Sequence, residues 1–168
     1  MKKKYIIIGI IVIIITILLC AFLYLKSDNY KLNHLFDNLI KENQLYNNYR
    51  YNEYDNHVGI VFYEGDEEEV FIPEVIDGKK VLSIDDSAFY GKTNIKKVTI
   101  PSSVIYIGHQ TFIGDKNIEE IVLPDNILRI GEHAFDVCRS LKRIYVKKGS
   151  KTELTLKETN FYKYIYYK

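Results

Sequence analysis

The chain has 168 residues, enough for one domain with or without a membrane segment. Its formal net charge is +1, but Lys2, Lys3 and Lys4 supply three of the 23 basic residues, and the 22 acidic residues outnumber the remaining 20. This balance excludes the strong positive field that nucleic-acid binding requires.

The first predicted element is a membrane-spanning helix over residues 5–25. The stretch carries no charged side chain, and a helix of this length is about 31 Å long, enough to cross the hydrocarbon core of a bilayer. The lysines before it place residues 1–4 in the cytoplasm and the rest of the chain outside, by the positive-inside rule.

Two other interpretations of residues 5–25 stay open. A cleaved signal peptide usually has a shorter apolar core and a small-residue cleavage site, whereas this run ends in Phe22, Leu23, Tyr24 and Leu25. A lipid anchor would use Cys20, but Leu19 is bulky where such sites need a small residue. An uncleaved signal anchor is therefore expected, with secretion after cleavage and lipidation at Cys20 as the alternatives.

A polar connector is predicted over residues 26–56. Within residues 27–45, apolar side chains recur at helical spacing behind Ser27, Asp28 and Asn29, each a possible helix cap. This pattern fits a short amphipathic helix, and it fits a stalk with a frayed helical start equally well. Residues 46–56 show no period and much polarity, which indicates a linker.

A β-hairpin is predicted next, as the N-terminal cap of a domain that spans residues 57–150. Apolar residues alternate over 58–62 and again over 70–72, and residues 64–67 turn the chain between them. A cap is required because the end of a stacked repeat array exposes an apolar layer. The acidic residues 64–69 lack the spaced ligands of a calcium loop and indicate a solvated turn.

Three copies of a 23-residue repeat are predicted over residues 72–146. Phe89, Phe112 and Phe135 lie at this spacing, and three aliphatic columns repeat with them. The columns are Ile84, Ile107 and Ile130; Val98, Ile121 and Ile144; and Ile100, Leu123 and Val146. A fixed period in this range is typical of a solenoid, in which each coil buries its apolar side against its neighbours. The sequence therefore predicts a β-rich α/β solenoid of three coils.

The ends of the three copies carry the L-x-x-L-x-L strand signature of a leucine-rich repeat. The three signatures are Ile95-x-x-Val98-x-Ile100, Ile118-x-x-Ile121-x-Leu123 and Leu141-x-x-Ile144-x-Val146. The second and third copies also share Ile/Leu-Pro at Pro101 and Pro124, Ile-Gly at Gly108 and Gly131, and the phenylalanine column, with a cysteine at Cys138.

In these motifs residues 58–150 resemble the BspA-like class of bacterial leucine-rich repeats. The chain departs from the pattern at Asp85, which replaces the glycine, and at Thr111, which replaces the alanine; Lys92 and Asp115 occupy the cysteine column. The resemblance implies a surface or secreted bacterial protein with a binding role. We expect Gly108 and Gly131 at a backbone bend that disfavours a Cβ, with Asp85 tolerating the same conformation.

The strand residues that face outward provide the candidate binding site. Two predicted columns alternate in charge from coil to coil: Glu69, Lys97, Glu120 and Arg143, beside Glu68, Lys96, Glu119 and Lys142. Opposite charges on neighbouring strands favour one register. The third column is a partly apolar stripe of Phe71, Thr99, Val122 and Tyr145. It is either an ordinary exposed sheet surface or the contact surface for a protein partner.

No catalytic, cofactor-binding or metal-binding motif is recognised in the sequence. His109 and His133 are expected as exposed loop residues, not as metal ligands. Cys138 is the only cysteine beyond the anchor, so no disulfide within the domain is possible, and a buried thiol is expected. Residues 151–168, in which Leu154 and Leu156 alternate, are predicted to cap the last coil.

These observations favour a membrane-anchored, extracytoplasmic leucine-rich repeat module for protein–protein interaction at a bacterial cell surface. The sequence predicts no enzyme activity, no cofactor and no small-molecule substrate. The alternatives are a structural or accessory subunit that packs against another membrane protein, and a secreted repeat protein.

Overall fold

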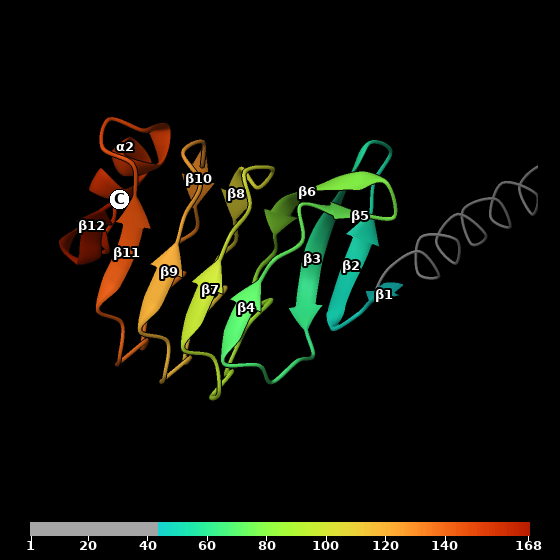
Figure 1. Ribbon diagram of the computed structural model, residues 1–168, viewed down its shortest axis with the longest axis horizontal. Helices are drawn as coiled ribbons and strands as arrows, with labels where there is room; N and C mark the ends of the chain where they lie inside the picture. The colour runs from blue at the N-terminus through green and yellow to red at the C-terminus, as the bar shows by residue number, and fades with distance from the viewer. Residues whose placement is uncertain (1–43) are drawn as a thin grey trace, which may run out of the picture. The chain divides into compact units, whose positions relative to one another are not determined.

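The computed structural model describes residues 44–168, which form two β-sheets wound from one chain (Figure 1). Sheet A contains, in spatial order, β1 (Gln44–Tyr46), β2 (Tyr49–Glu53), β3 (His57–Tyr63), β6 (Lys79–Ile84), β8 (Tyr106–Ile107) and β10 (Arg129–Ile130), and β5 (Val75–Ile76) pairs with β6. Sheet B contains β4 (Glu69–Phe71), β7 (Lys97–Thr99), β9 (Glu120–Val122), β11 (Arg143–Val146) and β12 (Ile165–Tyr167). Helix α2 (Lys151–Lys157) and the 3-10 helix η1 (Tyr162–Tyr164) precede β12.

The chain passes repeatedly from sheet A to sheet B. β3 leads to β4, β6 to β7, β8 to β9 and β10 to β11, and the last turn runs through α2 to β12. All pairings within sheet B are parallel, as are those that join β3, β6, β8 and β10. The arrangement is a β-rich solenoid of about five turns. The predicted fold is confirmed, but the predicted number of three coils is too low.

Unequal coil lengths explain why the sequence predicts fewer coils than the structure contains. Val70 pairs in register with Val98, so the first coil is longer than the interval between successive ladder phenylalanines. Ile144 pairs with Ile165, so the last coil is shorter than that interval. The longer first coil contains β5 and a tight turn at Asp77 and Gly78, both of which have positive φ. A single fixed period in the sequence therefore does not include these outer coils.

An aromatic ladder runs through the interior from end to end. The rings of Phe89 and Phe112 stack with centroids 4.9 Å apart, and those of Phe112 and Phe135 with centroids 5.6 Å apart. Tyr63 extends the ladder at one end and Phe161 at the other, each with a centroid 5.0 Å from the neighbouring ring. All five side chains are buried, so each ring packs apolar area against the next coil.

The N-terminal cap differs from the prediction. The expected hairpin of residues 58–72 is wrong, because β3 belongs to sheet A and β4 to sheet B, on opposite sides of the first coil. The antiparallel strands are instead β1, β2 and β3. The linker prediction for residues 46–56 is also wrong, because β2 lies there and buries Tyr49 and Tyr51.

Helix α2 closes the other end of the solenoid. The Ser150 hydroxyl caps the helix by accepting the Glu153 N–H at 3.2 Å, and the Glu153 carboxylate accepts the Gly149 N–H at 2.6 Å. The Thr152 hydroxyl ties the helix to the preceding coil by donating to the Pro124 carbonyl. Leu156 is buried, so this segment covers the last coil as a helix and not as an alternating strand.

Gly108 and Gly131 permit close contact between coils. A Cβ on Gly131 would lie 2.5 Å from the Gly108 carbonyl carbon, and a Cβ on Gly108 would lie 2.5 Å from the Asp86 nitrogen. Neither glycine has positive φ, so the constraint is backbone approach and the expected bend is not the reason. Asp85 is accommodated because Gly59 faces it without a side chain: a Cβ there would come within 3.0 Å of the carboxylate oxygens.

The predicted transmembrane helix at residues 5–25, Cys20 and most of the connector lie outside the described residues. Residues 44 and 45, at the end of the predicted amphipathic helix, belong to β1. Within residues 44–168, no helix has the length and apolar character that a membrane crossing requires.

Asp115 is a buried polar residue in the apolar core. The residue is fully buried, and neither carboxylate oxygen has a hydrogen-bond partner among the described residues. Burial raises the pKa of the Asp115 carboxyl from its ordinary value of 3.8 to about 8, against a smaller opposing effect of Lys92. Between about pH 4 and about pH 8 the carboxyl is therefore protonated in the folded chain but ionised in the unfolded chain.

We expect Phe112→Ala to lower the free energy of unfolding by about 3–5 kcal/mol, because the ring packs against coils on both sides. Chemical denaturation measures this loss. Tyr90→Ala is the control, since Tyr90 is 62% exposed and its truncation should change stability little. A Phe112→Ala chain as stable as the control would contradict the role of the ladder.

We expect stability to decrease as the pH rises from about 4 to about 8, through the interval between the unfolded and folded pKa values of Asp115. A raised carboxyl pKa stabilises the folded chain at low pH, and this contribution is lost as the folded group ionises. Asp115→Asn should remove this part of the pH dependence, measured by denaturation at several pH values. The exposed Asp125 provides the control, because Asp125→Asn removes a carboxyl at the surface and leaves the core unchanged. Equal slopes in all three chains would contradict the assignment to Asp115.

Candidate functional site

The outward face of sheet B brings the predicted columns into register. Glu69 lies beside Lys97, Lys97 beside Glu120, and Glu120 beside Arg143. The stripe runs across the same strands at their other ends, so that Phe71 lies beside Thr99, Thr99 beside Val122, and Val122 beside Tyr145. Figure 1 shows β4, β7, β9 and β11 side by side in this order. The register that the sequence predicts is confirmed.

Exposure along the stripe is uneven. Phe71 is 65% exposed, whereas Thr99, Val122 and Tyr145 are half-buried by their neighbours. A fifth residue continues the stripe, because β12 pairs with β11 and places Tyr166 beside Tyr145. Tyr166 is 55% exposed, and its ring meets the Tyr145 ring edge-on with centroids 5.5 Å apart. Repeat spacing did not indicate Tyr166, because its coil is shorter than the three regular ones.

The charged columns form ion pairs across the strands. Lys96 Nζ lies 2.9 Å from Glu68, and Lys142 Nζ lies 2.8 Å from Glu119. The hydrogen bond from Lys142 lowers the pKa of the Glu119 carboxyl, and the bond to Glu68 raises the pKa of Lys96. These side chains are well exposed, so solvent screening leaves each pair only a weak contribution to stability. Their joint effect is a face without a dominant sign of charge.

Glu120 is the most connected residue of this face. Its carboxylate accepts hydrogen bonds from Arg143 Nε at 3.1 Å and from the Tyr145 hydroxyl at 3.3 Å, and Lys97 Nζ lies 3.9 Å away. The Tyr145 ring is therefore held in place by its hydroxyl as well as by Tyr166. A side chain that is already ordered loses little conformational entropy when a partner binds.

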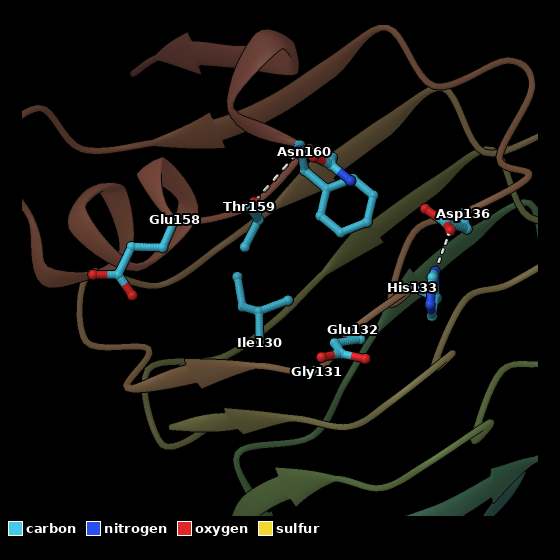
Figure 2. A pocket seen from close by; sticks show the side chains of 9 residues that line it. Ile130, Gly131, Glu132, His133, Asp136, Glu158, Thr159 and Asn160 are labelled. Carbon is cyan, nitrogen blue, oxygen red and sulfur yellow. Dashed lines mark hydrogen bonds and ion pairs between the residues drawn. The ribbon is translucent and has the colours of Figure 1, made fainter.

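A groove of about 370 Å³ lies at the C-terminal end of sheet A. Figure 2 shows His133 and Asp136 on one side of this groove and Glu158 on the opposite side. His133 pairs with Asp136, and the distance from His133 Nδ1 to Asp136 Oδ2 is 2.5 Å. His109 also contacts His133, with ring centroids 5.4 Å apart, a contact that sequence spacing did not indicate. Within residues 44–168 no group of three histidine, cysteine, aspartate or glutamate side chains is arranged to hold a metal ion.

Cys138 is buried in the coil after Asp115, as expected. Its thiol donates to the Phe112 carbonyl oxygen at 3.1 Å. Burial raises the pKa of the thiol to about 12, so it is not ionised at neutral pH. The residue is a buried packing element of the coil.

Stacked coils with a continuous parallel sheet on one side define a leucine-rich repeat domain. The sequence profile of the BspA type leucine-rich repeat region matches residues 61–165 in six copies. The chain belongs to this family.

Solved structures of bacterial leucine-rich repeat proteins share the fold. A T. pallidum leucine-rich repeat protein is 31% identical with a TM-score of 0.58, over 62% of this chain and 53% of that one. A leucine-rich cell surface protein from Faecalibacterium prausnitzii is 27% identical with a TM-score of 0.52, over 61% and 32% of the two chains. A Bacteroides capillosus protein is 25% identical with a TM-score of 0.59, over 74% and 97%. The chain thus spans about half of the first protein and a third of the second. No curated protein sequence matches it.

Proposed function

We propose that this chain is a surface-exposed bacterial module that binds a protein partner through the outward face of sheet B. The stripe of Phe71, Thr99, Val122, Tyr145 and Tyr166 carries this proposal. Aromatic side chains contribute most of the energy of many protein interfaces, and two of the three in the stripe are more than half exposed. The continuous parallel sheet beneath them provides a rigid support.

The charge pattern favours a partner that is recognised by shape and apolar contact. Positive and negative side chains alternate beside the stripe and cancel at a distance, so steering of a charged partner would be weak. Association should therefore depend little on salt concentration.

The proposed location outside the cell, with residues 5–25 as an uncleaved anchor, is supported by two observations. Residues 5–25 carry no charge and follow three lysines. The Faecalibacterium prausnitzii relative is a cell surface protein. The module would then face the cell exterior or wall.

We expect Phe71→Ala and Tyr145→Ala each to weaken partner capture about tenfold, as loss of an aromatic anchor does. The immobilised full chain is incubated with a surface-protein extract, and captured protein is quantified at increasing concentration. Phe71→Ala should leave the melting temperature nearly unchanged, whereas Tyr145→Ala should lower it slightly because the contacts with Glu120 and Tyr166 are lost.

Tyr90→Ala is the matched control for the capture experiment, because this exposed tyrosine lies in the turn between β6 and β7 and not on a strand of sheet B. It should capture the partner as well as the parent does. Undiminished capture by both stripe variants would show that the face is only a sheet surface. Capture that requires a second membrane protein in the same membrane would favour an accessory subunit instead.

We expect protease added to intact cells, with any wall removed, to digest residues 44–168. The three N-terminal lysines should hold the other end of the anchor in the cytoplasm. An epitope tag at the C-terminus, followed by immunoblotting, measures the digestion, and a cytoplasmic protein serves as the control for lysis. Protection of the tag until the cells are lysed would reverse the proposed orientation, and release of the intact chain into the medium would indicate cleavage.

A further inference from the structure

Sheet B ends in an unpaired strand edge at β4. β4 is the last strand of sheet B and pairs only with β7. The Ile72 N–H donates to the Thr99 carbonyl at 3.1 Å, and the Glu68 carbonyl accepts the Lys97 N–H at 3.1 Å. Because successive residues of a strand point their backbone groups to opposite sides, Glu69 and Phe71 point theirs away from β7.

Within residues 44–168 the free edge presents two unbonded donors, the N–H groups of Glu69 and Phe71, and one unbonded acceptor, the Glu69 carbonyl. The Phe71 carbonyl accepts a hydrogen bond from the Tyr49 hydroxyl at 3.0 Å. The Phe71 N–H and the Glu69 carbonyl make no hydrogen bond within residues 44–168. These two groups are the ones that a single residue of an added parallel strand, opposite Val70, would bond. The site ends at the Phe71 carbonyl, because the Tyr49 hydroxyl already donates a hydrogen bond to that oxygen.

There is space for such a strand beside the edge. A groove of about 350 Å³ lies along β4 and is lined by Asn48, Tyr49, Tyr63 and Glu67 together with the three residues of β4. Sheet A continues through β2 and β1 beyond β3, whereas sheet B stops at β4 (Figure 1). One extended segment could occupy this position.

The charge columns determine which segment fits. Inside the sheet, Glu119 and Glu120 have basic residues on the strands at both sides. Glu68 has one basic neighbour, Lys96, and Glu69 makes no ion pair within residues 44–168. The next strand of the alternating pattern would therefore carry two consecutive basic residues. Beyond them it would carry an aliphatic residue facing inward and then a residue that covers Phe71.

A second copy of this chain fits less well. Its β12 could pair with β4, but its helix α2, which covers the end of its own sheet A, would meet the β1 and β2 strands that extend past β4. Only one of the two charged columns would be matched, because the copy would place Lys163 beside Glu68 but Tyr164 beside Glu69.

We infer that the free edge of β4 binds an extended basic–basic–aliphatic segment of a protein partner by parallel strand addition, with its basic pair beside Glu68 and Glu69. The site adjoins the outward face of sheet B at Phe71, but the inference rests on the strand edge and does not depend on the function proposed for that face. A segment of this kind already pairs with the other edge of β4. There β7 places Lys96 and Lys97 beside Glu68 and Glu69, followed by Val98 and Thr99.

The chain supplies both a probe and its control. The probe is a labelled peptide with the sequence of residues 95–100, Ile-Lys-Lys-Val-Thr-Ile, and the control has the sequence of residues 118–123, Ile-Glu-Glu-Ile-Val-Leu. Both keep the strand pattern of apolar residues, but their charges are opposite. Fluorescence anisotropy with the full-length chain in a mild detergent should show that the basic peptide binds at least about tenfold more tightly.

Two modifications test the register. The variant with Glu68→Lys and Glu69→Lys should reverse the preference between the peptides, and circular dichroism confirms that it is folded. N-methylation of the peptide residue that corresponds to Val98 removes the N–H directed at the Glu69 carbonyl and should weaken binding about tenfold. N-methylation at the residue that corresponds to Thr99, which points away from β4, should leave binding unchanged.

Equal binding of the two peptides, equal effects of the two N-methyl groups, or no binding of the basic peptide would each overturn the proposal. Self-association of the chain that the basic peptide abolishes would also overturn it, by assigning the edge to a second copy. Tyr145→Ala separates the two surfaces: it should not change peptide binding, and a loss there would place the peptide on the face of sheet B.

Discussion

Stacking of one coil on the next is the interaction on which this domain depends. No coil can enclose its own apolar side chains, and no disulfide links the coils, since Cys138 is a free thiol. The ladder from Tyr63 to Phe161 therefore has to be continuous, and each end has to be covered by a different kind of structure. The antiparallel strands β1 and β2 cover one end and helix α2 covers the other.

Much of this fold can be predicted from a repeated spacing, but only where coils are equal in length. Residues 84–146 keep a regular period in their core columns, so these columns and strands follow from the sequence. Outside them the first and last coils change length, and three coils are predicted where five turns exist. The β2 strand is not predicted, because its pairing register shifts between Arg50 and Tyr51 and this shift breaks the alternation of a regular strand. Helix α2 could have been predicted, because Ser150 and Glu153 form the capping-box pattern at its start.

The candidate binding face follows from the sequence because parallel strands of equal coils come into register automatically. Phe71 to Tyr145 could be placed in this way, but Tyr166 could not. The free edge of β4 is a different kind of feature. A sequence pattern shows which residues form a strand, whereas the point at which a sheet stops depends on the path of the neighbouring chain. The contact between His109 and His133 is likewise not indicated by spacing, because the two residues lie one position out of phase in the repeat.

The alternating charges make two coils, and not one, the unit by which this solenoid can change its length. Loss of the single coil that carries Lys96 and Lys97 would bring Glu119 and Glu120 beside Glu68 and Glu69, so that like charges would face each other. Loss or duplication of two adjacent coils keeps opposite charges in contact. Each pair is weak on its own, but selection acting on many such events would favour growth by even numbers of repeats. The history of the array would then be recorded in its charges more durably than in its aliphatic columns, which keep the same type of residue from coil to coil.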